Sequence, residues 1–429
     1  MTLTGRVVLL TLVGLLAIPL APTLATAVVW LGVVALLVAL DLALAARIRD
    51  VRLDRATLPP VHLLEDTESV LTVTNTGRRR ARGVLRDAWQ PSAGARLIHR
   101  VDLTPGDHAT LSTPLRPTRR GDLRADRVTL RLLGPLGLAG RQRSVPLTGL
   151  LRVLPAFPSR RHLPGLLRHL QLLDGRAVVR LPGQGTEFDS LRDYVRGDDV
   201  RSIDWRATAR AGTTMLRTWR PERDRHVVLI VDTGRTAAAR VGDGTRLDAA
   251  LEAALLLSAL AARAGDHVHL LMHDRVTRAR VTGVDGAALL PALTDAMAPV
   301  HARLVDTDWH GAFASVRTLT TRPSLLVVLT AQDAAESARG FLGAFPDASR
   351  AMTVLVGSVT DDGIAALTRA RESREDVYLA AAAERTLRDA ENVADAIRRA
   401  GGEAIAADPE DLPPRIADRY LELKAAGRL

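Results

Sequence analysis

Three patterns of hydrophobic and polar positions follow one another along the chain. Residues 7–46 are mostly apolar, and Asp41 is their only charged residue. Residues 50–150 contain short segments in which apolar and polar positions alternate, and residues 226–429 contain unbroken apolar runs separated by longer amphipathic stretches. These patterns predict membrane-spanning helices, then strands with one solvated face, then buried parallel strands that alternate with helices.

The apolar start of the chain predicts a hairpin of two transmembrane helices within residues 1–49. One span takes about 20 apolar residues, so residues 7–46 are long enough for two, and Pro19 and Pro22 mark the turn between them. Arginines flank the outer ends of the pair and are absent from the turn. The positive-inside rule therefore places both termini and the soluble domains in the cytoplasm, at the cell inner (cytoplasmic) membrane. The alternative is a cleaved signal peptide, which we disfavour because a second apolar run follows the cleavage-like residues 25–27 immediately.

Asp41 lies near the cytoplasmic end of the second apolar run. A charged residue inside a span is a candidate for a function in the membrane. Because it lies close to the end of the span, we expect instead a side chain that reaches water or pairs two helices.

Residues 50–150 predict a small β-sandwich. Residues 69–75 alternate between apolar and polar positions, and the turn signal Asn-Thr-Gly follows them. Further strand-like segments lie at 83–89, 95–103, 108–115 and 127–133. Several short strands with turn signals between them are typical of this architecture.

Residues 151–225 predict a connector that is rich in proline and glycine and contains a helix over residues 163–173. Further along, Phe188, Leu191 and Val195 are spaced as on one face of a helix. Asp199 is a candidate cap for a second helix, and residues 214–222 are expected to be extended.

Residues 226–429 predict a parallel sheet covered by helices on both faces. Strands are expected at 226–232, 267–273, 276–281, 324–330, 352–358, 377–380 and 404–408. Asp232 ends the first of these strands, and ligands on such sheets bind beyond the carboxyl ends of the strands. The sequence therefore predicts a functional site near Asp232.

Composition excludes several kinds of site. The chain has no cysteine, so disulfides, Cys-ligated zinc and a cysteine nucleophile are excluded. Its one lysine, Lys424, does not follow a glycine-rich loop, which excludes a G-x-x-x-x-G-K-[ST] phosphate-binding loop. The positive excess lies in residues 1–225, as suits a region beside an anionic membrane.

The segment 187–212 mixes acidic, basic and aromatic residues, and three functions fit that mixture. Its carboxylates suit acid–base catalysis by a membrane-bound hydrolase, and its arginines with Tyr194 and Trp205 suit nucleic-acid binding. However, neighbouring arginines keep carboxylates ionised, and the acids would repel phosphate. We therefore favour a structural joint in which Trp205 and Ile203 are apolar anchors, and we expect a non-enzymatic protein with no nucleic-acid partner.

Three histidines, His267, His269 and His273, share one face of a predicted strand. Metal ligation by several histidines is chemically possible. Because a strand inside a covered sheet leaves little room for an ion, we expect hydrogen-bonded or half-exposed histidines instead.

The residues around Asp232 resemble the Asp-x-Ser-x-Ser motif of von Willebrand factor A domains, which binds Mg²⁺ through oxygen ligands. Asp232 and Thr236 match the motif, and Thr307 matches the distant threonine of that family. Gly234 replaces the first serine, and Ala331 stands where the family usually has a second aspartate, with Asp333 two residues later. The resemblance thus implies a degenerate metal site, and we predict no cofactor or weak Mg²⁺ binding.

The connector resembles the signature of the domain-of-unknown-function 58 family. The matching positions are Glu187, Phe188, Leu191, Arg192, Tyr194, Gly197, Asp198, Arg201, Ile203, Asp204, Trp205, Ala209 and Arg210. Residues 119–138 and 420–428 also look like that family. The resemblance implies a bacterial membrane protein with a von Willebrand A-like domain, and often a partnership with a MoxR-type AAA+ ATPase.

These observations together predict an α/β protein with four parts. They are a transmembrane helical hairpin (1–49), a β-sandwich-like domain (50–150), a connector (151–225) and a doubly wound, von Willebrand A-like parallel sheet (226–429). We expect a membrane-anchored scaffold or adaptor. The predicted partner-binding residues are Asp232, Thr236, Thr307 and Asp308.

Overall fold

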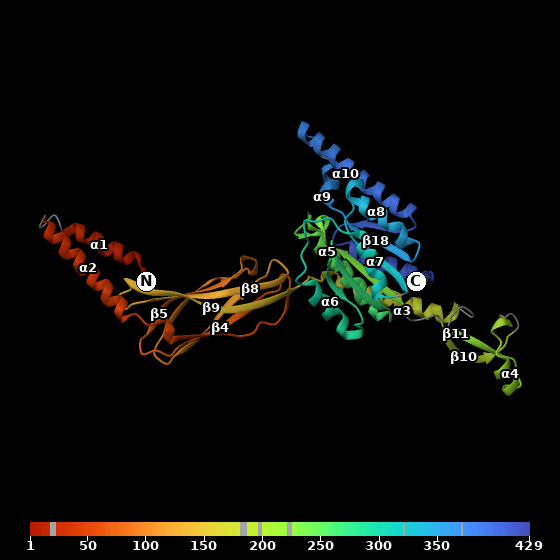
Figure 1. Cartoon of the computed structure of the whole chain (residues 1–429), viewed down its shortest axis with the longest axis horizontal. Coiled ribbons are helices and arrows are strands. Elements are labelled where there is room, and N and C mark those ends of the chain that lie inside the picture. Colours follow the sequence, from red (N-terminus) through yellow and green to blue (C-terminus); the bar gives the residue numbers. More distant parts are fainter. Residues whose placement is uncertain (18–22, 181–186, 196–199, 221–224, 321, 370–371) are drawn as a thin grey trace. The chain divides into compact units, whose positions relative to one another are not determined.

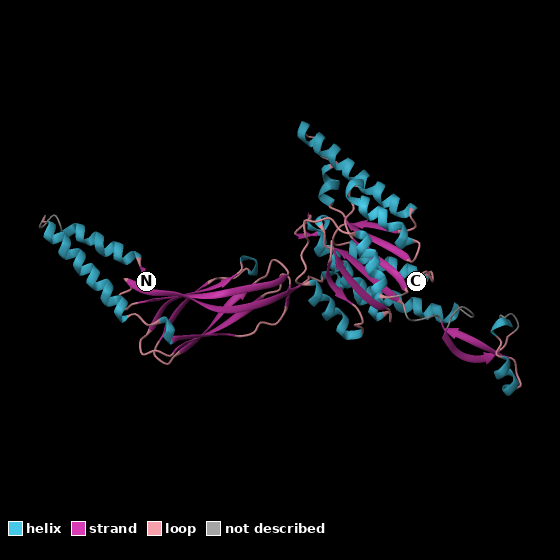
Figure 2. Cartoon of the chain, viewed as in Figure 1, coloured by secondary structure: helices cyan, strands magenta, loops and turns pink. Residues whose placement is uncertain are grey.

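The computed structural model of this chain describes residues 1–17, 23–180, 187–195, 200–220, 225–320, 322–369 and 372–429. The chain forms two compact units, Met1–Leu154 and Pro155–Leu429. The first unit contains a pair of helices and two sheets of strands, and the second contains a sheet with helices around it (Figures 1 and 2). The mixed α/β prediction is confirmed.

Two apolar helices, α1 (Gly5–Ala17) and α2 (Leu24–Leu44), begin the first unit. In the described part of the chain, one helix, the α2 segment, is long and apolar enough to cross a membrane by length and composition. The two helices approach closely, because a Cβ atom on Gly14 would lie 2.2 Å from Nε1 of Trp30. The predicted turn with Pro19 and Pro22 lies outside the described residues.

Asp41 joins α2 to the strands that follow it. Its carboxylate is fully buried and accepts backbone N–H groups from the turn at 134–138 and the start of the next strand. The donors are Leu136 (2.7 Å), Leu138 (2.7 Å) and Ala139 (2.8 Å). The expectation of a water-reaching or helix-pairing residue is therefore wrong. A turn more than ninety residues later supplies its partners, and no local pattern indicates them.

The strands of the first unit form two sheets that share one core. One sheet has the order β2-β4-β7, formed by Val51–Arg55, Thr67–Asn75 and His108–Leu115. The other has the order β1-β9-β8-β5-β6 with β3 on β9, formed by Thr2–Leu3, Ala139–Leu154, Gly121–Leu133, Ala81–Trp89, Ile98–Leu103 and Val61–His62. Alternating side chains of β4 are buried, as the sequence predicts for a strand with one solvated face.

A buried ion pair lies inside this sandwich. Both Arg55 and Asp87 are buried, and the guanidinium donates to both carboxylate oxygens at 2.6 and 3.0 Å. Trp89 donates its indole N–H to the same carboxylate (3.0 Å), and Arg55 also donates to Ser69 (2.6 Å). Each charge is thus compensated by several partners, as burial requires.

The second unit is built on a six-stranded sheet with the order β16-β15-β12-β17-β18-β19. All neighbours pair in parallel except β16, which runs antiparallel to β15 at one edge. The strands are β12 (His226–Asp232), β15 (His267–His273), β16 (Thr277–Val281), β17 (Pro323–Leu329), β18 (Thr353–Val359) and β19 (Glu403–Ala407). The central strands are almost wholly buried, which explains their unbroken apolar runs.

Helices cover both faces of this sheet (Figure 1). One face packs against α3 (Leu163–Arg180), α5 (Arg246–Arg263), α6 (Leu289–Met297) and α11 (Leu412–Ala425). The other packs against α7 (Trp309–Leu319), α8 (Ala335–Ser349) and α10 (Arg374–Arg399). Thus the expected covering of both faces is present.

A predicted strand at 377–380 is instead part of α10. Ser373 and Asp376 form a capping box that starts this helix, and alanine, glutamate and arginine dominate the residues that follow. A four-residue apolar run fits a strand or a helix equally well, so the cap and the helix-forming residues after it decide the outcome.

Tyr420 and Lys424 of α11 bind the buried Asp266, just before β15. The Tyr420 hydroxyl donates to one carboxylate oxygen, and Lys424 donates to the other at 2.8 Å. Lys424 also reaches the Ala264 carbonyl (3.3 Å). The chain's one lysine therefore fastens the last helix to the end of α5.

The segment of the family signature forms a small unit of two strands and one short helix, β10 (Glu187–Asp193), β11 (Met215–Arg220) and α4 (Trp205–Ala211). The predicted helix through Phe188 and Leu191 is wrong, because these residues lie on β10 and pair with β11. The predicted extended segment at 214–222 corresponds to β11. Asp199, the expected cap, lies outside the described residues, and Asp204 caps α4 instead.

Candidate functional site at the carboxyl edge of the sheet

Asp232 ends the central strand β12, between β15 and β17. Connections from a central strand to opposite sides open a crevice at this edge of an α/β sheet. Here, however, the loop before α7 closes over it. Arg235 N donates to the Val305 carbonyl (2.8 Å), and Arg303 N donates to the Thr233 carbonyl (2.7 Å).

The Asp232 carboxylate accepts four hydrogen bonds from its own chain. Oδ1 accepts from the Gly234 backbone N–H (2.8 Å) and the Thr307 hydroxyl (2.5 Å). Oδ2 accepts from the hydroxyls of Thr236 (3.1 Å) and Thr330 (2.7 Å). Asp232 is only 2% exposed, so these donors replace the water that burial removes.

The structure brings Asp232, Thr236 and Thr307 together, as the sequence predicts. Asp308 does not join them: it is exposed, and its carboxylate caps α7 by accepting from Gly311 N (3.1 Å). The glycine in place of the expected serine also has a physical reason. A Cβ atom on Gly234 would lie 2.3 Å from Thr307 Oγ1, so a larger residue would push the threonine away from Asp232.

Thr330 is a site residue that sequence reasoning missed. It directly follows β17, and its hydroxyl accepts from Gln332 Nε2 (3.0 Å) while donating to Asp232. The sequence does contain a clue to Thr330, because this hydroxyl residue directly follows the apolar run of the neighbouring strand. Attention to the family's second aspartate pointed instead to Ala331 and Asp333.

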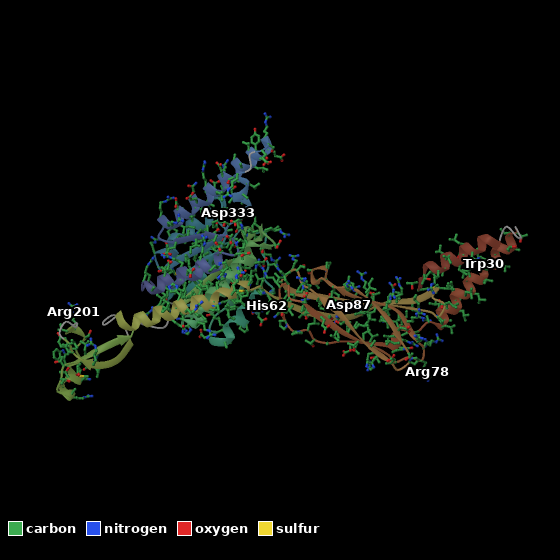
Figure 3. All side chains as sticks on the ribbon, turned by 180° about the vertical axis from the view of Figure 1, so that it is seen from behind. Trp30, His62, Arg78, Asp87, Arg201 and Asp333 are labelled. Atoms are coloured by element: carbon green, nitrogen blue, oxygen red, sulfur yellow. The ribbon has the colours of Figure 1, made fainter. Side chains whose placement is uncertain are left out.

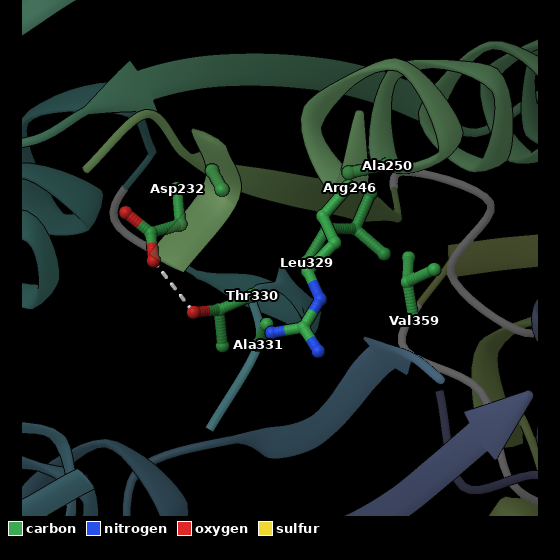
Figure 4. A pocket seen from close by; sticks show the side chains of 8 residues that line it. Asp232, Arg246, Ala250, Leu329, Thr330, Ala331 and Val359 are labelled. Atoms are coloured by element: carbon green, nitrogen blue, oxygen red, sulfur yellow. Dashed lines mark hydrogen bonds between the residues drawn. The ribbon is translucent and has the colours of Figure 1, made fainter. Parts of the chain in front are cut away.

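A small pocket lies between Asp232, Thr330 and α5 (Figure 4). Ala331 lines it, and so does Arg246, the first residue of α5. The Arg246 guanidinium forms an ion pair with Asp333. The free volume is about that of one water molecule, well below what a substrate-sized ligand needs.

The oxygen atoms here fit a magnesium ion poorly. Mg²⁺ takes octahedral oxygen coordination, but the three threonine hydroxyls all donate to Asp232. The nearby Asp333 is held by Arg246, whose positive charge opposes a cation. In the described part of the chain, no group of three or more His, Asp or Glu side chains is arranged to hold a metal. Weak or absent Mg²⁺ binding stays a prediction.

The histidines of β15 lie along the whole strand rather than at one site. At its amino end His269 contacts His226 (Nε2 to Nδ1, 2.9 Å) and Thr282 (2.7 Å), and the rings of His226 and His267 stack with centroids 5.2 Å apart. Burial, with positive charge from His226 and His267, lowers the pKa of His269 to about 4. At the carboxyl end burial lowers the pKa of His273. Both are buried and neutral near pH 7, as expected of core histidines.

The signature residues are distributed over the small two-stranded unit. Glu187 and Arg192 lie on β10, Tyr194 follows it, and Arg201 lies in the turn before α4. Gly197 and Asp198 lie outside the described residues. Arg210 lies on α4, as does Trp205.

Trp205 is 70% exposed, so its expected role as a buried anchor is wrong. Asp204 is fully engaged: it accepts from Arg206 N (2.9 Å) and Ala207 N (3.0 Å) and pairs with Arg217 (2.7 Å). The backbone N–H of Ala207, with Arg217, lowers the pKa of Asp204. A carboxylate held in the charged form in this way makes a poor general acid.

Residues 190–394 match the family described as protein of unknown function DUF58. The DUF58 match begins within β10 and ends within α10, so it contains Asp232, Thr236, Thr307 and Thr330. Uncharacterized proteins of Mycobacterium tuberculosis and Mycobacterium bovis are 29% identical over 115 residues, which is 27% of this chain and 36% of theirs. The chain thus spans about a third of the length of the curated relatives it matches.

Solved structures resemble short parts of the chain at low similarity. The ASH/PapD-like domain 7 of human CEP192 is 13% identical with a TM-score of 0.19, covering 25% of this chain and 87% of that one. The CARDB domain of a Pyrococcus furiosus protein is 18% identical with a TM-score of 0.18, covering 24% and 92%. At these scores neither likeness supports an inference about function.

Proposed function

We propose that this protein is a non-enzymatic scaffold, anchored in the bacterial inner membrane by α1 and α2, that binds a protein partner at the carboxyl edge of the second unit's sheet. The partner class we favour is a MoxR-type AAA+ ATPase, from the resemblance of the signature segment and the DUF58 match. We also propose, from the resemblance of residues 232–236 and Thr307, that the second unit is a von Willebrand A-like domain. The mainly parallel sheet and the hydrogen bond from Thr307 to Asp232 support this proposal.

The saturated Asp232 carboxylate is the observation that carries this proposal. Its four hydrogen bonds fix the loops at 233–236 and 301–308 against each other. Rigid loops on a sheet scaffold suit recognition, and a site with room for about one water does not suit turnover.

An exposed rim surrounds this buried carboxylate. Leu304 is 81% exposed, and beside it Asp306 pairs with Arg235 at 2.9 Å. Asp308 is exposed at the start of α7. An exposed leucine among charged groups fits the apolar centre and polar edge of a protein interface.

The test is co-purification of the full-length protein from its own membranes, with bound proteins identified by mass spectrometry. We expect a MoxR-type AAA+ ATPase to be enriched with the natural protein and lost with Leu304→Asp. The control is Leu367→Asp, an equivalent change at another exposed leucine, on α9 (Asp362–Leu367). Equal enrichment with both variants would exclude this edge as the binding surface. Replacing Asp232 itself would test folding rather than binding, because its carboxylate is buried.

A further inference from the structure

Arginines gather where α2 ends and the sandwich begins. The Thr76 backbone N–H and hydroxyl both donate to the Asp50 carbonyl, at 2.8 and 2.7 Å. This contact joins the turn after α2 to the loop between β4 and β5. These two segments contribute five arginines, of which Arg80 forms an ion pair with Asp102. The other four, here called the arginine collar, are Arg47, Arg49, Arg78 and Arg79.

Two arginines of the collar already have partners. Arg79 donates to the carbonyls of Ala43 and Ala45, so it caps the carboxyl end of α2. Arg49 lies 3.7 Å from the Asp50 carboxylate, the outer limit of an ion pair.

The other two arginines, Arg47 and Arg78, are not paired with any carboxylate of the described residues. Both are exposed, and in the described part of the chain neither is within ion-pair distance of a carboxylate. Arg78 lies at the surface of the first unit, whereas Asp87 lies inside it (Figure 3). The collar therefore presents two guanidinium groups that are available to an anion.

The position of the collar is fixed relative to the apolar helix. Asp41 is held by three backbone N–H groups of the sandwich, and Arg79 holds the end of α2. The helix ends at Leu44, and Arg47 follows within one turn's length of chain. Leu40 and Leu44 are exposed on α2 just before the collar.

We propose that the arginine collar binds the phosphate of an anionic phospholipid headgroup while Leu40 and Leu44 contact its acyl chains. Guanidinium groups match phosphate oxygens in charge and geometry. A lipid fits better than free phosphate, because only a lipid also satisfies the exposed leucines beside the arginines. This inference rests on the proposed membrane anchoring of α2.

The test uses the full-length protein reconstituted into vesicles of phosphatidylcholine alone or mixed with phosphatidylglycerol. Flotation reports insertion, and native mass spectrometry after gentle extraction reports which lipid stays bound. We expect phosphatidylglycerol to be retained in preference to phosphatidylcholine. An arginine near an anionic surface contributes about a fivefold change in affinity, so the double variant Arg47→Gln/Arg78→Gln should weaken retention by about 25-fold.

The matched control is Arg119→Gln/Arg124→Gln, which removes the same charge near the opposite end of β5 and β8. It should retain phosphatidylglycerol as the natural protein does. Equal retention by the natural protein and the collar variant, with normal flotation, would overturn the collar proposal alone. Loss of lipid retention on adding inorganic phosphate would also overturn it, in favour of a free-phosphate site. Failure of the natural protein to float with either vesicle would overturn the membrane anchoring as well.

Discussion

Two buried aspartates, one in each unit, are stabilised in opposite ways. Asp87 lies in the sandwich with a bidentate arginine and an indole N–H. Asp232 lies at the edge of the parallel sheet with four uncharged donors, and no Lys or Arg of the described chain is within ion-pair distance of it. Both are almost fully buried.

The difference separates two purposes of a buried carboxylate. An arginine and an aspartate that neutralise each other hold two strands together and leave little net charge. A carboxylate that accepts hydrogen bonds from several neutral groups instead holds the loops that carry those groups together. The first arrangement is structural, and the second organises the rim that we propose as a binding surface.

The largest effect should come from Asp87→Ala. The change leaves Arg55 buried without a counter-charge, which costs about 4 kcal/mol in the free energy of unfolding. Denaturant unfolding of the detergent-solubilised chain, with hydrogen exchange of β4 and β5, measures it. The control is Asp102→Ala, which removes an exposed ion pair with Arg80 and should change stability little. Similar results for both variants would mean that burial of the pair is unimportant.

A buried neutral histidine should make the parallel sheet of the second unit sensitive to acid. The pKa of His269 is lowered to about 4 in the folded protein, against about 6.5 in the unfolded chain. The unfolded state therefore binds more protons between these values, so stability is lost as pH falls through that window. Between about pH 7 and pH 5 the loss should be roughly 2 kcal/mol. His269→Gln should reduce this slope, and the exposed His310→Gln should not.

A smaller loss is expected from Thr330→Val, which keeps the shape of the side chain and removes one hydrogen bond to Asp232. A hydrogen bond to a charged group contributes about 1.5 kcal/mol or more. Thr353→Val is the control, because that hydroxyl donates at 3.2 Å to an exposed carbonyl, Arg428 O. Equal melting temperatures of the two valine variants would show that the hydrogen bond from Thr330 to Asp232 does not stabilise the fold.

The smallest effect should come from Trp205→Ala. The indole is 70% exposed, so we expect a change within about 0.5 kcal/mol. A loss of several kcal/mol in thermal unfolding would show that the tryptophan is buried in solution. That result would support the hypothesis that residues 187–212 form a structural joint with Trp205 as an apolar anchor.

The inner strands β12, β15, β17 and β18 could be predicted because burial on both faces makes each one an apolar run. Residues 187–193 could not, because a bulge between Phe188 and Ser190 shifts the alternation of β10. Phe188 and Leu191 are therefore three positions apart. This spacing fits a helix as well as it fits a bulged strand.

The sequence predicts those residues of the candidate site that belong to a recognisable motif. Asp232, Thr236 and Thr307 were found, whereas Thr330 depends on strand register. Val231 pairs with Leu329, which brings the two following residues together, and a single sequence does not give that pairing. The partners of Asp41 were hidden for the same reason, since they lie far away in the chain.

The single lysine has a practical consequence. Apart from the amino terminus, Lys424 Nζ is the chain's one primary amine, and it is held between Asp266 and Tyr420. Amine-directed acylating reagents should therefore label Lys424 of the native protein very little. Lys424 should react only when α11 separates from the sheet. The rate of its acylation would therefore measure how often this end of the second unit opens.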